Sequence, residues 1–515
     1  MNDLPLVKSM SGITMRHKNS FWITFWVSLF LLIGLGIRLY DLTDLPLDFH
    51  ATRQLFSALK ARGLYAAFAT NMPEWQRQIA IRQWREIGII EPPIMEFLVA
   101  QTYRFTGLQL WVARIYSSLF WVLGGLPVFW LGRRLGRNWV IGLIALGVYL
   151  SVPYGGIASR SFQPDPLMVS LMVWAWWGAY TWYESPTFQR AVVAGLLAGL
   201  AILVKNLVVF LVLPPLLLLL FERYHLQIWR QPQAWVILIL SVLPTGVYTI
   251  YGVWISGFLK SQFSGRFFPQ LWIDPVFYIR WLGQIEHVVG SRYLFALGLA
   301  GIFLSASPTH RRWLLILWLG YFALGFAFSY HYMTHDYYHL PLIPLMALSI
   351  SPVVDTVYQR LRELTFSKFA TAVLIGVLVI LFANNLWDIR VTLKRNDYRH
   401  EASFWATLGE KLANGSVMAL THDYGYRLAY WGWKDAGIWP TQGDLFLRQL
   451  SGGSPEDILH EFQAHIEGFD YFLITLMGEY ENQPVLKQTL EQHYTLLDQG
   501  DGYLIFDLRH PKGTP

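Results

Sequence analysis

Acidic, basic and imidazole side chains gather in the segment Asp41–Gln54, directly after the first apolar run of the chain. Asp48, His50 and Arg53 are its most reactive members. A carboxylate such as Asp48 can take a proton as a general base or bind a divalent cation, and an arginine can neutralise a phosphate. The same residues also have a structural explanation without a catalytic role. They would form the polar end of a membrane helix, followed by a surface helix over 52–68.

Further charges lie close to apolar runs. Glu91 precedes a proline pair, which stops one element and can begin the next helix at its first turn. Asp165 lies at an expected helix start, where capping is its ordinary role, and Arg160 could bind an anion or anchor the membrane interface. Lys205 separates two apolar runs, where a charge is costly unless it has a role or its side chain reaches the interface.

Three histidines and an aspartate occur within the nine residues from His331 to His339. His335 and His339 are four residues apart and could share a helix face, as metal-ligand pairs do. Together with Tyr338, they also fit an aromatic belt at a membrane surface. We favour the belt over a zinc site.

The composition requires membrane helices to position these side chains. Hydrophobic residues make up 54% of the 515 residues and charged residues only 14%, against about 25% charged residues in a typical soluble domain. This composition excludes an ordinary soluble enzyme and a disordered chain. A net charge of +6 does not indicate nucleic acid as a partner, and the absence of cysteine excludes disulfides, thiolate metal sites and a cysteine nucleophile.

Eleven apolar runs predict about eleven transmembrane helices, because about 20 apolar residues span a bilayer. The first run is a retained helix rather than a cleaved signal peptide. The runs are 21–40, 111–132, 139–155, 165–183, 191–204, 207–221, 234–254, 292–306, 313–330, 339–356 and 369–386.

The orientation depends on the segment 92–107, which is only moderately apolar. If it does not cross the membrane, the short cytoplasmic loops hold nearly all the loop arginines, whereas the short outside loops hold little more than Arg160 and Lys205. We therefore predict an outside-facing, partly embedded helix over 92–107, a cytoplasmic N-terminus and a non-cytoplasmic C-terminus. The basic residues on the cytoplasmic side are then Arg133, Arg134, Arg137, Arg190, Arg223, Arg230, Arg311, Arg312, Arg360, Arg362 and Lys368.

Two domains are predicted: a transmembrane domain over 1–387, with a first outer loop over 41–110, and a non-cytoplasmic domain over 388–515. The second domain is expected to be a small soluble α/β domain, because strand-like and helix-like segments alternate in it. Its expected strands are 417–420, 471–476, 494–497 and 503–508, and its expected helices are 454–466 and 483–492.

These segments, in this order, resemble the protein O-mannosyltransferase and aminoarabinose transferase superfamily of polytopic glycosyltransferases (glycosyltransferase family 39-like), often called the GT-C fold. The resemblance covers roughly the first 350 residues. It departs from the family pattern where Asp48-Phe-His50 replaces Asp-Glu and where Glu91 precedes the prolines. The matching pieces are Asp48–Arg53, Glu91-Pro-Pro, Trp111–Ser117 with Leu131–Gly136, Ser159-Arg160 with Pro164-Asp165, Gly195–Ala201 with Lys205, and Tyr337-Tyr338 with Leu340–Pro344.

The resemblance implies a glycosyltransferase in the cell or inner membrane, or in the ER membrane of a eukaryote. It would move a hexose or pentose from a polyprenyl-phosphate donor to a hydroxyl of a protein, lipid or glycan, on the non-cytoplasmic face and with inversion. Asp48 is the expected base, and Asp165 would orient the acceptor or a cationic partner. The expected substrate-binding residues are His50, Arg53, Glu91, Arg160, Lys205, His335 and Tyr338.

No cofactor is required, because a phosphate is already a competent leaving group once its charge is stabilised. A divalent metal could still bind if Asp48, His50, Asp165 and His335 converge. A membrane transporter or lipid flippase is the main alternative function, and a non-catalytic assembly factor is a third. Transporters often carry internal repeats and midplane charges, whereas this chain shows no repeat and its ionisable residues cluster at one face.

Overall fold

The computed structural model describes residues 6–260, 267–454 and 462–512. These residues divide into two compact units. The first, the helical unit, lies within Met1–Leu42, Ile89–Ile94 and Ala113–Arg395, and the second, the sheet unit, lies within Thr43–Gly88, Met95–Val112 and Asn396–Pro515. Most of the first outer loop therefore packs with the C-terminal segment, whereas the prediction grouped 41–110 with the transmembrane domain.

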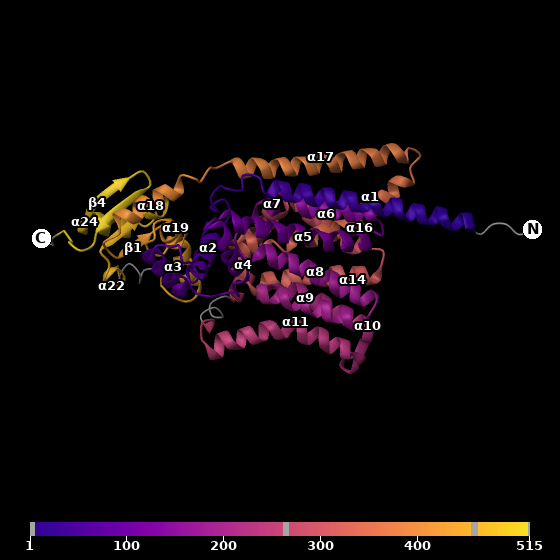
Figure 1. The fold of residues 1–515 in the computed structure, drawn as a ribbon, viewed down its shortest axis with the longest axis horizontal. Helices are drawn as coiled ribbons and strands as arrows, with labels where there is room; N and C mark the ends of the chain where they lie inside the picture. The colour runs from indigo at the N-terminus through magenta and orange to yellow at the C-terminus, as the bar shows by residue number, and fades with distance from the viewer. Residues whose placement is uncertain (1–5, 261–266, 455–461, 513–515) are drawn as a thin grey trace, which may run out of the picture. The chain divides into compact units, whose positions relative to one another are not determined.

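The helical unit is built from long, mostly antiparallel helices, several of which run side by side in Figure 1. Each of the eleven predicted apolar runs falls on one of them. α8 packs on α9, α9 on α11, α10 on α14, and α13 on α16. The helices are α1 (Leu6–Arg38), α5 (Trp111–Leu135), α6 (Trp139–Ser151), α7 (Pro153–Ala158), α8 (Asp165–Glu184), α9 (Phe188–Val204), α10 (Val209–Tyr224), α11 (Pro232–Ile250), α12 (Pro275–Val289), α13 (Arg292–Leu304), α14 (Pro308–Ala327), α15 (Ser329–Thr334), α16 (Leu342–Arg362) and α17 (Ser367–Lys394).

The chain is a multi-pass integral membrane protein. Within the described residues, six helical segments are long and apolar enough to cross a membrane, or seven if α12 and α13 count as one span bent by 89°. The predicted number of eleven is not confirmed. One reason is length, since α6 has 13 residues and α9 has 17, fewer than the roughly 20 that a bilayer requires.

Three of the arginines predicted for the cytoplasmic side, Arg134, Arg137 and Arg312, form ion pairs at one end of the helical unit. Three ion pairs, each between residues far apart in sequence, join the loops there. They are Arg134–Glu184 at 2.9 Å, Arg137–Asp355 at 3.5 Å, and Arg312–Glu222. The Tyr183 hydroxyl near the end of α8 also donates to Glu222 of α10. These contacts together place the ends of α5, α8, α10, α14 and α16 that bear the paired residues on one side of the unit.

The other end of α1 is fixed by two buried arginines. Arg38 donates to Ser159 Oγ at 2.6 Å. Arg160 donates to the backbone carbonyls of Tyr40 and Asp41, the latter at 2.9 Å. Carbonyl groups in the last turn of a helix have no partner within the helix, and Arg38 also donates to that of Gly34. The two arginines thus tie the end of α1 and the residues after it to the segment before α8.

The sheet unit holds a five-stranded sheet in the order β2-β1-β3-β5-β4. β1 runs parallel to β2 and β3, whereas β5 runs antiparallel to β3 and β4. Its strands are β1 (Val417–Leu420), β2 (Gly437–Ile438), β3 (Tyr471–Ile474), β4 (Thr495–Gly500) and β5 (Tyr503–Asp507). Its helices are α2 (Ala51–Ala66), α3 (Glu74–Glu86), α4 (Ile94–Thr106), α18 (Glu401–Lys411), α19 (Tyr426–Trp431), α20 (Gln442–Leu450), α22 (Phe462–Ile466), α23 (Met477–Glu481) and α24 (Pro484–His493).

All four predicted strands are present, and so is the helix predicted over 483–492. The helix predicted over 454–466 lies partly outside the described residues, and α22 is its described end. β2 was not predicted, because two residues are too short to show an alternating pattern.

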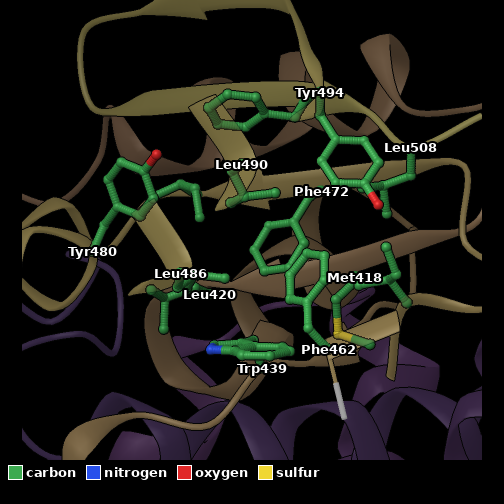
Figure 2. Packing of buried hydrophobic residues seen from close by; sticks show 13 residues of the cluster. Met418, Leu420, Trp439, Phe462, Phe472, Tyr480, Leu486, Leu490, Tyr494 and Leu508 are labelled. Carbon is green, nitrogen blue, oxygen red and sulfur yellow. The ribbon is translucent and has the colours of Figure 1, made fainter. Parts of the chain in front are cut away.

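Both faces of the sheet are covered, as the apolar residues of its strands require. Side chains alternate between the two faces of a strand. Met418 and Phe472 therefore pack on one side with Trp439 and Phe462 (Figure 2). Their sequence neighbours pack on the other side against α18 and α19. Such burial on two faces explains why these strands read as continuous apolar runs.

The first outer loop is held in the sheet unit by Arg62 of α2. Its guanidinium donates to the carbonyls of Ala429 and Tyr430 in α19 and, at 2.6 Å, to Gln83 Oε1 in α3. Burial lowers the pKa of Arg62 to about 10, so the side chain stays charged at neutral pH. A fully buried cation with three acceptors fixes α2 and α3 against the C-terminal segment.

Candidate functional site

A buried ion pair marks the break between α9 and α10. α9 ends at Val204, Lys205 is extended, and a short 3-10 turn follows. Lys205 Nζ lies 2.8 Å from Asp165 Oδ1, and the two side chains are only 6% and 1% exposed. Asp165 is the first residue of α8, so an interruption in one helix faces the start of another. Charges buried in this way are costly unless they are paired and have a role.

The ammonium group of Lys205 keeps donors available beyond this pair. It lies 5.1 Å from the ring centres of both Tyr337 and Tyr338, close enough for cation–π attraction. An ammonium has three N–H donors, and within the described residues its hydrogen bond is to Asp165. Asp165 is therefore paired with a cation, and its predicted roles in the reaction stay predictions.

Lys205 lines a cavity of about 320 Å³ inside the helical unit. The polar part of the wall includes Glu91, Asn206 and Tyr338. Three of the predicted substrate-binding residues, Glu91, Lys205 and Tyr338, are thereby brought to one cavity from distant parts of the sequence. Small-molecule sites are of this size and combine apolar walls with a few polar groups.

Arg160 is placed differently from its predicted role. Its guanidinium is 1% exposed and donates to the end of α1, and it does not line the cavity described above. This geometry gives Arg160 a role within the protein, and its buried side chain does not fit an anchor at the membrane interface. A substrate-binding role for Arg160 stays a prediction.

The histidine segment is not arranged as a helical metal-ligand pair. α15 ends at Thr334, and His335 is extended, so His335 and His339 do not share an α-helical face. Both ring nitrogens of His339 are occupied, Nδ1 by the Tyr321 hydroxyl at 2.6 Å and Nε2 by the Tyr332 carbonyl at 2.9 Å. The expectation of a shared helix face is wrong, because the α-helix ends before His335.

His335 instead belongs to a packed group of rings. Its Nδ1 lies 2.7 Å from Thr334 Oγ1, and its ring centre lies 5.4 Å from that of His331 and 6.0 Å from that of Tyr338. In the part of the chain that the structure describes, no three His, Asp or Glu side chains converge to hold a metal ion.

Asp48, His50 and Arg53 lie together in the sheet unit, at the start of α2. His50 caps the helix with a left-handed backbone, φ 42°. Asp48 Oδ1 accepts a long hydrogen bond of 3.5 Å from Gln54. The Arg53 guanidinium lies 5.7 Å from the ring centre of Phe56. All three side chains are partly exposed and could meet a ligand.

Sequence reasoning missed the hydroxyl groups that line the cavity. Thr245, Tyr248 and Thr249 of α11 belong to its wall. Their spacing of three and four residues places them on one helix face, so polar residues at this period inside an apolar run were the available signal. Sequence reasoning also missed Asp423, which accepts a hydrogen bond from Thr52. The two residues are more than 370 positions apart, so no local sequence pattern could indicate this contact.

Comparison with known proteins identifies the architecture. Residues 90–250 match the family model for dolichyl-phosphate-mannose-protein mannosyltransferase. A crystal structure of ArnT from Cupriavidus metallidurans bound to undecaprenyl phosphate matches with a TM-score of 0.56 and 15% identity, over 94% of this chain and 98% of that one. This chain has the ArnT fold.

The apo structure of ArnT from the same organism matches with a TM-score of 0.52, at 16% identity and the same coverage. No curated protein matches the chain in sequence. The resemblance that the motifs indicated is thus confirmed. The family model spans Glu91, Asp165 and Lys205, so the cavity and its ion pair lie largely in the matched region.

Proposed function

We propose that the chain is a membrane glycosyltransferase that moves a monosaccharide from a polyprenyl-phosphate donor to an acceptor hydroxyl, on the non-cytoplasmic face and with inversion. The observation that carries the proposal is the cavity that contains Lys205, with its ammonium oriented by Asp165. The matches to a mannosyltransferase family model and to ArnT support the reaction class.

The donor phosphate binds at Lys205 in this proposal. A lysine held in an apolar cavity attracts an anion far more strongly than one in water, because the effective dielectric constant is low. The ArnT structure holds undecaprenyl phosphate, and we assign the same class of carrier to this chain. The lipid phosphate is also the leaving group, so Lys205 stabilises the negative charge that grows on it.

The transfer forms one bond and breaks one. The oxygen of the acceptor hydroxyl bonds to the anomeric carbon, and the bond from that carbon to the phosphate oxygen breaks with its electron pair staying on the polyprenyl phosphate. The hydroxyl proton must go to a base, and we assign this role to Asp48. No metal is needed for this balance, although a divalent cation could assist. Protein, lipid and glycan hydroxyls all remain candidate acceptors.

A transporter or flippase is the second candidate, and product analysis separates the two. The purified protein in lipid nanodiscs is supplied with radiolabelled polyprenyl-phosphate mannose or glucose and with an envelope lipid or peptide acceptor. A glycosyltransferase releases free polyprenyl phosphate and labels the acceptor. If the donor binds but stays chemically intact with every acceptor, while reconstituted vesicles move it between leaflets, the chain is a flippase and this proposal is wrong.

A further inference from the structure

The cavity beside Lys205 has a second set of polar groups besides the ion pair. Thr245, Tyr248 and Thr249 all come from α11 and all line it. Residues at i, i+3 and i+4 lie on one helix face, so the three hydroxyl groups form a short row along the wall. We call these three residues the hydroxyl row.

The opposite side of α11 is entirely different. Leu243, Val247 and Ile250 are 55%, 58% and 52% exposed, and α11 belongs to a segment apolar enough to cross a membrane. The helix therefore presents apolar side chains outward and hydroxyl groups to the cavity. Directly after the row it continues as a π-helical turn, Tyr251–Ile255, an irregularity often found at functional sites.

The hydroxyl group of Thr245 has no hydrogen-bond acceptor within α11. A threonine hydroxyl within a helix commonly bonds to the carbonyl four residues earlier, as Ser241 of α11 does with Ile237 at 2.7 Å. The Thr245 Oγ1 atom is buried and has no hydrogen-bond partner in the described part of the chain. Buried polar atoms without partners are rare and cost free energy, which points to a ligand that supplies the partner.

The rest of the wall suits a sugar ring. Phe210, Phe267 and Phe328 line the same cavity and can cover the C–H faces of a pyranose, while hydroxyl groups and the Asn206 amide can both donate and accept hydrogen bonds. The acidic side chain of Glu91 accepts from a hydroxyl but disfavours a negatively charged sugar. The chemistry fits an uncharged monosaccharide with several hydroxyl groups and not a uronic acid.

We propose that the hydroxyl row is the wall that recognises the monosaccharide of the donor, while Lys205 holds its phosphate. This assignment rests on the proposed function, because it takes the cavity as the donor site. A site built to hydrogen-bond a hydroxyl group discriminates strongly against ligands that lack it. The row therefore determines which sugar the enzyme accepts, whereas Lys205 determines that the sugar is carried on a phosphate.

The test compares a donor that carries a sugar with one that does not. Thr245→Val, Tyr248→Phe and Thr249→Val each remove one hydroxyl and keep the shape of the side chain. Ser241→Ala is the matched control, because its hydroxyl lies in the same helix but bonds to Ile237. The full-length variants bind polyprenyl-phosphate glucose, polyprenyl-phosphate mannose, polyprenyl-phosphate glucuronic acid or undecaprenyl phosphate alone in nanodiscs, and each dissociation constant is measured.

Of the glucose and mannose donors, one should bind the wild type more tightly. We expect each hydroxyl variant to bind that donor about tenfold more weakly, the scale of one hydrogen bond. Each variant should bind undecaprenyl phosphate as the wild type does. The glucuronic acid donor should bind the wild type more weakly than the neutral donors. Equal losses for the sugar-bearing and sugar-free lipids, or no loss for either, would overturn the assignment. If the wild type binds undecaprenyl phosphate as tightly as every sugar-bearing donor, the assignment of the sugar site is wrong but the phosphate site stands. If the wild type binds none of these four lipids, the proposed function itself is wrong.

Discussion

At the scale of single residues, Lys205 and Asp165 depend on each other for stability. Removing one partner of a buried pair leaves the other charge without compensation, at a cost of about 3–5 kcal/mol, whereas replacing both is often neutral. Lys205→Met alone should therefore lower the melting temperature, and adding Asp165→Asn should recover most of it. Thermal unfolding of the purified protein in detergent measures both effects.

Binding separates the structural role of the pair from its functional role. The Lys205→Met/Asp165→Asn double variant folds but lacks the ammonium, so it should bind undecaprenyl phosphate about 10- to 150-fold more weakly, the scale of a charged hydrogen bond. If the double variant binds this lipid as tightly as the wild type, Lys205 does not bind the phosphate and has only a structural role.

Asp48 is the residue on which the chemical step depends in the proposed reaction. Asp48→Asn keeps the shape and the contact with Gln54 but removes the base. Loss of a general base typically costs about 10²- to 10⁴-fold in rate, while donor binding should survive, because Lys205 is unchanged. Single-turnover assays with bound donor measure the rate. Near-full activity in this variant, combined with loss of activity in His50→Ala, would move the base to His50.

Sequence could suggest the residues of the site but not their grouping. Polar residues next to apolar runs were predicted to bind substrate. Three of them, Glu91, Lys205 and Tyr338, line one cavity. Arg160 lay in a similar position in the sequence, yet two of its nitrogens donate to the carbonyls of Tyr40 and Asp41, just after α1. Which acceptor a buried arginine meets depends on packing between distant segments, and this information is absent from local pattern.

At the scale of elements, the turn after β1 is constrained in its backbone and contacts the N-terminus of α2. Asp423 and Tyr424 both have φ 53°, followed by Gly425 with φ 77°. A left-handed backbone costs roughly 1–2 kcal/mol for each residue other than glycine. The strained turn brings Asp423 Oδ1 to 2.8 Å from Thr52 Oγ1. We infer that the turn positions the start of α2, where Asp48 and Arg53 lie.

Thr52→Val tests this inference, because it keeps the size of the side chain and removes the hydrogen bond to Asp423. Amide hydrogen exchange over residues 51–56 should become faster, by a factor that corresponds to about 1.5–3 kcal/mol, the scale of a bond to a charged acceptor. Exchange in α11 should not change. Thr407→Val is the control, since its exposed hydroxyl bonds only within α18. Equal effects of the two variants would show that the contact does not position α2.

Element type was predictable where periodicity was strong. All four predicted strands of the sheet and the helical state of every apolar run came from hydropathy and alternation alone. The number of spans did not, because crossing a membrane depends on length and on what surrounds a helix. α12 and α13 bend by 89° at Gly290, and a single hydropathy window does not reveal such a corner.

At the scale of the whole molecule, charge is distributed between the two ends of the helical unit. Arg134, Arg137 and Arg312 form ion pairs at one end. Lys205 lies between α9 and α10, and the opposite end of α10 carries Glu222 of one of those pairs. Positive loops face the cytoplasm in most membrane proteins. The proposed site is therefore expected on the non-cytoplasmic side of the membrane.

This orientation can be tested cleanly, because the chain contains no cysteine. Gln189→Cys and Gln227→Cys lie at exposed positions in or beside the basic loops, and His400→Cys is exposed in the sheet unit. In intact cells, a membrane-impermeant maleimide should label the variant at 400 and spare those at 189 and 227; after permeabilisation it should label all three. An even number of crossings between residues 227 and 400 would make positions 227 and 400 react alike, which would contradict the predicted sidedness. If positions 189 and 227 are labelled in intact cells and position 400 is protected, the orientation of the chain is the reverse of the prediction. The transfer reaction would then use a donor in the cytoplasmic leaflet.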